Sequence, residues 1–293
     1  MRIGIDLGGS KTEGVVLDAR GDQLLRLRRP TPQHLGYQAV LENVATLVYA
    51  LEQDIDSRCT IGIATPGTLN PDGSVKNSNT ICLNGQPLQH DLEALLMRPV
   101  RLENDANCFA LAEAIGGAGR GAHTVFGVIM GTGVGGGIVV GGQLLPGLAH
   151  IAGEWGHNCL EPDGPRCYCG RNGCVETFLS GPGFTADYQR LGGSTGLTPP
   201  AIVQQAQQGD GVARAALERL LERFGRALAS VINILDPHAV VLGGGLSNLE
   251  ALYSEGPEHI AQHVFDTNLK TPILRNLNGD SAGVHGAAQL WPT

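Results

Sequence analysis

The chain opens with RIGIDLGGSKTEGVVLD (residues 2–18), in which a glycine-rich polar tip separates two apolar runs. This pattern predicts a β-hairpin, because two strands pair readily across a short turn of glycine and polar residues. A related stretch, VFGVIMGTGVGGGIVV, returns at residues 125–140. Two such units in one chain indicate an internal duplication, and we therefore expect two similar α/β halves.

Strand-like and helix-like segments alternate in the rest of the chain. Apolar residues recur at helical spacing in residues 40–51, and a long helical pattern over residues 212–235 stops before Pro237. We expect strands at 61–64, 100–102 and 239–242, and helices at 40–51, 106–115, 212–235 and 281–290. A further helix is expected near Ser247, and a polar loop at residues 192–200.

Composition limits the class of protein. A chain of 293 residues can bury a large core and suits two domains. Its net charge of −8 argues against nucleic acid as a partner, because backbone binding needs clustered Lys and Arg. The apolar runs are shorter than the roughly 18 residues of a membrane span, so we expect no membrane partner. A strand follows Met1 almost at once, which predicts a chain without a signal peptide and a cytoplasmic location.

One histidine and three cysteines have the spacing of a metal site: His157, Cys167, Cys169 and Cys174. Zinc prefers four N/S ligands in a tetrahedron, and a site with four protein ligands is structural. Gly170 and Gly173 would let the backbone curl around the ion. The alternative is that these cysteines are buried small residues, the role that we assign to Cys59, Cys82, Cys108 and Cys159. Metal-binding cysteines fit a reducing compartment.

Glycine turns offer a place for phosphate groups, because their backbone N–H groups are not covered by side chains. Neither hairpin tip matches the P-loop pattern. Asp6 ends the first strand and could hold Mg²⁺, although it could instead bond to its own turn. The candidate nucleotide-binding residues are Asp6, Gly8, Gly9, Ser10, Lys11, Thr12, Gly131, Thr132, Gly133, Gly243, Gly244 and Gly245.

Asn104 and Asp105 stand where a strand ends and a helix begins. They could simply be an N-cap pair. In the functional interpretation, Asp105 is a general base and Asn104 orients a substrate hydroxyl. A helix N-terminus keeps the aspartate ionised, and phosphoryl transfer through a loose transition state depends more on positioning than on strong basicity.

Glu154, His157 and Glu176 flank the cysteine run. If a zinc ion fixes this loop, their side chains come close together, and carboxylates with an imidazole suit the hydroxyls of a sugar. His157 can bind the metal through one nitrogen and donate a hydrogen bond from the other.

Taken together, these motifs resemble the ROK family, which groups bacterial sugar kinases with related transcriptional repressors. The resemblance runs from the first strand to the final helix, with Ser10 where the family usually has Thr. Its motifs are DLGGSKT (6–12), PG (66–67), ENDAN (103–107), GTGVGGG (131–137), GEWGH (153–157), CYCGRNGCVE (167–176) and GGG (243–245). It implies the actin-like (ribonuclease H-like) two-lobe ATPase fold with the sugar in the cleft between the lobes. The first domain would be residues 1–118, joined by a returning helix at 279–293, and the second 119–278, with the zinc loop at 157–174.

The resemblance also implies roles for residues and cofactors. ATP with Mg²⁺ would lie between the glycine tips, with its adenosine near residues 243–245, and Asp105 would take the proton from the sugar hydroxyl. Zinc would shape the sugar site without acting as a Lewis acid, and the protein would be a homodimer. The residues implied to bind the sugar are Gly67, Asn104, Asp105, Glu154, His157 and Glu176.

Among the possible activities, a kinase fits best. A sugar-responsive repressor would carry an N-terminal helix-turn-helix domain, for which the hairpin starting at residue 3 leaves no room. An actin- or Hsp70-like assembly or chaperone ATPase would not need the zinc loop. The resemblance is strongest to the fructokinase (mannokinase) branch, followed by N-acetylglucosamine kinases and then glucokinases. We therefore expect ATP-dependent 6-phosphorylation of fructose, with mannose as a side substrate.

Overall fold

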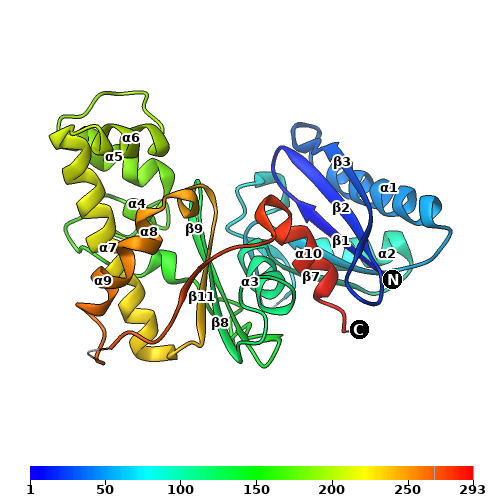
Figure 1. Ribbon diagram of the computed structural model, residues 1–293. Helices are drawn as coiled ribbons and strands as arrows, with labels where there is room; N and C mark the ends of the chain where they lie inside the picture. Colours follow the sequence, from blue (N-terminus) through cyan, green and yellow to red (C-terminus); the bar gives the residue numbers. More distant parts are fainter. Residues whose placement is uncertain (71, 267, 293) are drawn as a thin grey trace. The chain divides into compact units, whose positions relative to one another are not determined.

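The computed structural model of this chain describes residues 1–70, 72–266 and 268–292, apart from the side chain of Asp280 (Figure 1). Two compact units are formed by non-contiguous segments. Unit 1 contains Met1–Arg120, Gly137–Ala152 and Asn278–Thr293, and unit 2 contains Gly121–Gly136 and Gly153–Leu277.

The first hairpin lies at the centre of a five-stranded sheet with the order β3-β2-β1-β4-β7. β1 and β2 are antiparallel, with Asp6 opposite Glu13, whereas β4 runs parallel to both β1 and β7. The strands are β1 (Arg2–Leu7), β2 (Lys11–Leu17), β3 (Gln23–Pro30), β4 (Thr60–Thr65) and β7 (Val100–Asn104).

A second five-stranded sheet has the order β10-β9-β8-β11-β12, so its strands follow one another in the same spatial sequence as those of the first sheet. β9 and β10 are antiparallel, and β11 runs parallel to both β8 and β12. The repeated topology confirms the internal duplication that the two glycine-tipped hairpins predict. The strands are β8 (Thr124–Met130), β9 (Val134–Val140), β10 (Gln143–Leu144), β11 (Ala239–Gly243) and β12 (Ile273–Arg275).

Among the described residues of unit 1, four α-helices and a short hairpin accompany the sheet. The helical stripe at residues 40–51 is buried in the core of this unit, as its spacing predicts. The short hairpin is formed by β5 (Thr68–Leu69) and β6 (Val75–Lys76). The helices are α1 (Tyr37–Ile55), α2 (Leu88–Leu96), α3 (Asp105–Ile115) and α10 (Ala282–Gln289).

The C-terminal helix α10 touches the first sheet through glycine. A Cβ atom on Gly62 of β4 would lie 1.8 Å from the carbonyl oxygen of Ala287, and one on Gly4 of β1 would lie 2.0 Å from that of Val284. Only residues without a side chain allow helix and strand backbones to come so close. Figure 1 shows α10 lying against β1 and β2 of this unit.

Residues 137–152 belong to unit 1, because Gly137 lies against α3. A Cβ atom on Gly137 would be 2.8 Å from the side chains of both Ala110 and Asn107. The division of the sequence into 1–118 with 279–293 and 119–278 assigns this segment to the second domain, and that division stays a prediction.

Unit 2 is built around the long helix α7 (Gly211–Leu235), which ends before Pro237 as predicted. Asp210 caps its start by accepting a hydrogen bond from Ala213 N at 2.7 Å. Near Ser247 the predicted helix is instead a 3₁₀ turn over Gly245–Asn248, and α8 begins only at Ala251. The other helices of this unit are α4 (Glu176–Leu179), α5 (Gly181–Arg190), α6 (Pro199–Gln207), α8 (Ala251–Ser254) and α9 (Gly256–Ala261).

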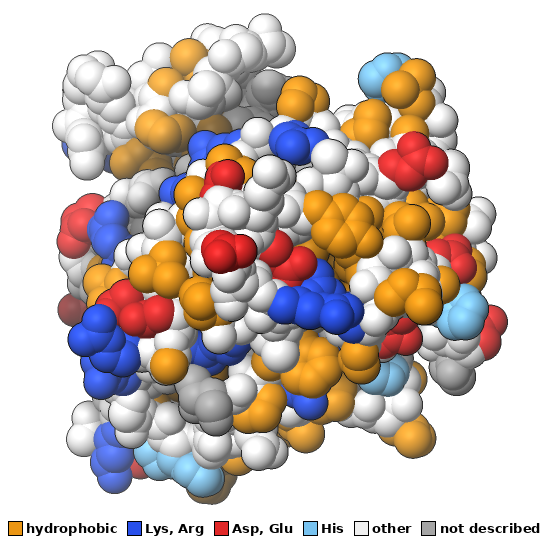
Figure 2. Space-filling view, turned by 90° about the vertical axis from the view of Figure 1, so that its right-hand side faces the viewer, with side chains coloured by type: hydrophobic (Ala, Val, Ile, Leu, Met, Phe, Trp, Pro, Cys, Tyr) orange, Lys and Arg blue, Asp and Glu red, His pale blue; other side chains and the backbone are white. Residues whose placement is uncertain are grey.

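Among the described residues, no helix combines the length and apolar character that a membrane span requires. The face shown in Figure 2 carries acidic, basic and apolar side chains intermixed.

Candidate functional site

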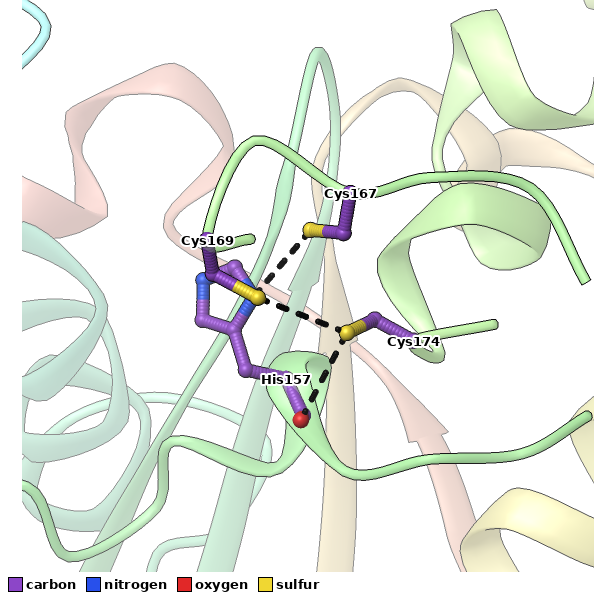
Figure 3. Close-up of side chains that lie close together, drawn as sticks. All are labelled: His157, Cys167, Cys169 and Cys174. Carbon is purple, nitrogen blue, oxygen red and sulfur yellow. Dashed lines mark hydrogen bonds between the residues drawn. The ribbon is translucent and has the colours of Figure 1, made fainter. Parts of the chain in front are cut away.

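The predicted metal ligands converge in unit 2 (Figure 3). The ligand atoms of His157, Cys167, Cys169 and Cys174 all lie within 4.8 Å of one another. Nδ1 of His157 is 3.6 Å from Sγ of Cys167, and the Sγ atoms of Cys169 and Cys174 are also 3.6 Å apart. Ligands at the corners of a zinc–thiolate tetrahedron lie about 3.7 Å apart, so this cluster fits zinc.

Two glycines shape the loop around this cluster, as expected. Gly170 and Gly173 have φ angles of +90° and +61°, which favour glycine. Cys167 N donates to Arg171 O at 2.8 Å and thereby closes the turn that carries Cys169. A Cβ atom on Gly173 would lie 1.5 Å from Glu161 O, so a side chain is excluded there.

The thiols of the cluster differ in acidity. Burial opposes ionisation of Cys169, but hydrogen bonds from Arg171 and the neighbouring cysteines lower its pKa to about 6. Burial, followed by the neighbouring thiols, raises the pKa of Cys174 to about 12. A bound cation would favour the thiolate form of every cysteine, and its binding would release protons.

The second ring nitrogen of His157 lies 3.0 Å from the hydroxyl of Tyr168. With a metal on Nδ1, the proton is on Nε2, which then donates to the Tyr168 hydroxyl. The two rings meet edge to face at 5.1 Å. Burial, followed by the charges of Glu176 and Glu154, raises the pKa of Tyr168 to about 12. In the sequence, the one signal for Tyr168 is its place between Cys167 and Cys169, and the motifs do not predict its contact with His157.

Glu176 connects the metal cluster with the second glycine tip. Its Oε2 accepts a hydrogen bond from Val134 N at 2.9 Å, and its Oε1 lies 3.8 Å from Sγ of Cys167. A Cβ atom on Gly133 would lie 2.6 Å from Oε2. Glu154 immediately precedes the 3₁₀ turn Trp155–His157. Unit 2 therefore brings His157 and Glu176 together at the cluster, with Glu154 three residues before His157 in the chain.

The two predicted glycine segments of unit 2 are neighbours. Gly131 O accepts a hydrogen bond from Gly181 N, the first residue of α5, at 2.8 Å. Gly244 has a φ angle of +79°, and a Cβ atom there would lie 2.6 Å from the carbonyl of Met130. The turn at residues 243–245 thus lies beside the tip that contains Thr132.

In unit 1, Asn104 has the N-cap role that its position predicts, and its role at a substrate hydroxyl stays a prediction. Its Oδ1 accepts hydrogen bonds from the backbone N–H groups of Ala106 and Asn107, at 2.8 and 3.3 Å, so it is the N-cap of α3. Its Nδ2 donates to Gly67 O at 2.7 Å. Asp105 begins α3, where the helix dipole favours its ionised form.

Asp6 lies in the field of other carboxylates. Burial, followed by the charges of Asp105 and Glu13, raises the pKa of Asp6 to about 6. A bound Mg²⁺ would offset the repulsion between Asp6 and the neighbouring carboxylates, so this position fits a cation site.

The first glycine tip is a tight turn in which Gly8 N donates to Lys11 O at 3.0 Å. Ser10 is exposed and Gly9 partly exposed. Thr12 is fully buried and its hydroxyl pairs with that of Thr31 at 2.8 Å. The predicted contact of Thr12 with nucleotide phosphate stays a prediction.

Comparison with known proteins identifies the family, since residues 2–293 match the ROK family. The chain belongs to the ROK family. It is 40% identical to an N-acetyl-D-glucosamine kinase of Yersinia enterocolitica over 99% of both chains. It also resembles the ROK hexokinase of Thermus thermophilus, with 33% identity, a TM-score of 0.86, and coverage of 98% of this chain and 96% of that one.

A ROK family glucokinase of Streptomyces griseus, solved in complex with glucose and AMPPNP, is also similar to this ROK protein. The identity is 29% and the TM-score 0.80, over 99% of this chain and 98% of that one. These matches confirm the predicted actin-like α/β fold. The Yersinia relative is named for N-acetyl-D-glucosamine, whereas the sequence motifs predict fructose.

Proposed function

We propose that this ROK protein is an ATP-dependent kinase that transfers the γ-phosphoryl group to the 6-hydroxyl of N-acetyl-D-glucosamine. The observation that carries the choice of sugar is the 40% identity, over 99% of both chains, to a kinase named for that sugar. Two groups of residues, one around Asp105 and one around the metal cluster, have the chemistry for phosphoryl transfer to a hydroxylated substrate.

Asp105 takes the proton of the attacking hydroxyl in this proposal. Asp105 lies at the N-terminus of α3, where the helix dipole favours negative charge, and Asn104 fixes the start of that helix. Gly67 and Asn104 hold the sugar beside it. Mg²⁺, bound with ATP and held by Asp6, supplies neutralisation of charge on the phosphate oxygens.

The residues around the metal cluster recognise the sugar in this proposal. Glu154 and Glu176 accept hydrogen bonds from hydroxyl groups, and His157 donates from Nε2, either directly or by way of Tyr168. His157, Cys167, Cys169 and Cys174 would hold a zinc ion, and because protein would supply all four ligands, the ion would contribute rigidity only.

An ADP-release assay across N-acetylglucosamine, fructose, mannose and glucose tests the proposal. We expect the highest kcat/KM with N-acetylglucosamine, and a 6-phosphate product by NMR. A higher kcat/KM for fructose would replace the proposed sugar. If none of the four sugars leads to ADP release, the proposal that the protein is a sugar kinase is rejected.

A further inference from the structure

Helix α7 carries an arginine that is almost completely buried. Arg223 is 5% exposed, and its guanidinium forms a two-point contact with Glu161, from Nε to Oε1 at 2.7 Å and from Nη2 to Oε2 at 3.1 Å. Nη1 lies 2.8 Å from Oδ2 of Asp187 on α5. The guanidinium also lies over the ring of Phe178, 4.2 Å from its centroid.

Such a buried ion pair adds little net free energy of folding. Removing an arginine and a carboxylate from water costs much of what their attraction returns, and apolar side chains often stabilise a core as well. An arginine fork does provide a fixed geometry, because it is planar and contacts a carboxylate at two points.

The Glu161 side leads to the metal ligands. Leu160 N and Glu161 N both donate to Gly173 O, at 2.7 and 3.2 Å, and Gly173 immediately precedes Cys174. Gly173 also lies so close to Glu161 O that a Cβ atom would be 1.5 Å from it. A shift of Glu161 would therefore displace the backbone that carries Cys174.

The contact with Phe178 connects Arg223 to Glu176, the carboxylate that is proposed to bind the sugar. Phe178 and Glu176 lie in the same turn of α4, and Glu176 is bonded to Val134 N at 2.9 Å. Arg223 consequently contacts both ends of the segment that contains Cys167, Cys169 and Cys174, one through a carboxylate and the other through a ring.

We propose that Arg223 is a positioning residue that holds Glu161 and Phe178, which flank the three cysteine ligands, so that this segment retains its ion and presents Glu176 to the sugar. The part concerning the sugar rests on the proposed function, whereas the part concerning the metal does not.

The test compares Arg223→Lys with Arg226→Lys. Lysine keeps the charge but lacks the fork. Arg226 is the matched control, because it reaches the same Glu161 oxygen at 3.1 Å from a more exposed position. The first measurement is the rate at which the zinc-loaded protein transfers zinc to a chromophoric chelator, with folding monitored by circular dichroism. The second is KM and kcat for N-acetylglucosamine.

We expect zinc transfer about 10-fold faster for Arg223→Lys and within about 2-fold of wild type for Arg226→Lys, the scale typical of residues that support metal ligands. KM for the sugar should rise several-fold, with kcat changing less. Unchanged zinc transfer in a folded Arg223→Lys protein, or equal acceleration in both variants, would overturn the proposal. If Arg223→Lys does not fold, Glu161→Gln takes its place with the same expectations and the same criteria.

The two proposals fail separately. A wild-type protein that phosphorylates none of the sugars, but whose zinc transfer responds to Arg223→Lys, would reject the proposed function and retain the role of Arg223 toward the metal. Wild-type protein that binds no zinc would overturn that role.

Discussion

Asn104 donates a hydrogen bond from Nδ2 to the carbonyl oxygen of Gly67 at 2.7 Å, while its Oδ1 caps helix α3. Gly67 has a φ angle of +88°, and a Cβ atom there would lie 2.5 Å from Lys76 O. One amide side chain thus ties the end of β7 and the start of α3 to the turn between β4 and β5. Both residues are proposed to bind the sugar.

Asn104→Asp should separate the two roles of this amide. A carboxylate still caps the helix, but it has no proton to donate to Gly67 O. We expect the free energy of unfolding to fall by about 1–2 kcal/mol and KM for the sugar to rise. Chemical denaturation and initial-rate kinetics measure these effects.

Asn104→Ala is the comparison, because it removes the cap as well. It should cost about 1 kcal/mol more in unfolding free energy than Asn104→Asp. Equal stability of the two variants would contradict the capping role, and an unchanged KM in both would contradict the role at the sugar.

Asp105→Asn should leave sugar binding nearly intact and lower kcat by about 10²–10⁴-fold, the range for loss of a general base. The amide is the same size but cannot take the proton. Asp210→Asn is the matched control, since Asp210 caps the start of α7 in unit 2 and asparagine caps equally well. Isothermal titration with sugar and steady-state kinetics give the two quantities. Near-normal turnover of Asp105→Asn would rule out the assigned role.

The duplicated fold was predictable because its signals are local. The glycine-tipped hairpin at residues 2–18 and its counterpart at 125–140 each predict one sheet. The apolar residues of α7 recur at helical spacing along its whole length. The docking of α10 is not a local signal. It depends on Gly62 and Ala287, which are far apart in the sequence, and on the close approach of their backbones.

The candidate site was predictable where one motif carries several of its residues. The spacing of Cys167, Cys169 and Cys174 predicted a cluster that the structure assembles with His157. The contacts of Arg223 with Glu161 and of His157 with Tyr168 were not predicted. In a helix such as α7, arginine is ordinarily a solvated residue, and only the folded unit shows that this one is buried.

Cys169→Ser should abolish zinc binding, because serine supplies no thiolate. Its loss should lower the midpoint of thermal unfolding and raise KM for the sugar, since binding of a structural metal contributes to folding stability. Cys159→Ser is the matched control: Cys159 is an exposed free cysteine that lies close in sequence but outside the ligand set. Metal analysis of the purified proteins and thermal unfolding with and without a chelator provide the data. Equal zinc content in the two variants would refute the assigned ligand.

His285 on α10 is half-buried, with Nε2 lying 3.1 Å from Oε1 of Gln23 and Nδ1 lying 3.4 Å from Oδ1 of Asn278. Burial, followed by the charge of Arg26, lowers the pKa of His285 below its usual value of 6.5, while Glu13 opposes this. The folded protein therefore holds this imidazole neutral at a pH where the unfolded chain already protonates it.

Below about pH 6.5 the unfolded chain protonates His285 whereas the folded protein does not. The contribution of neutral His285 to the free energy of unfolding is therefore fully present above that pH. It is lost as the pH falls from about 6.5 toward the pKa of the folded state. His285→Gln keeps a polar side chain but cannot be charged. We expect its free energy of unfolding to fall less steeply than that of wild type between about pH 7.5 and 5.5. Denaturation series at matched ionic strength measure both slopes, and parallel curves would show that His285 carries no part of the pH dependence.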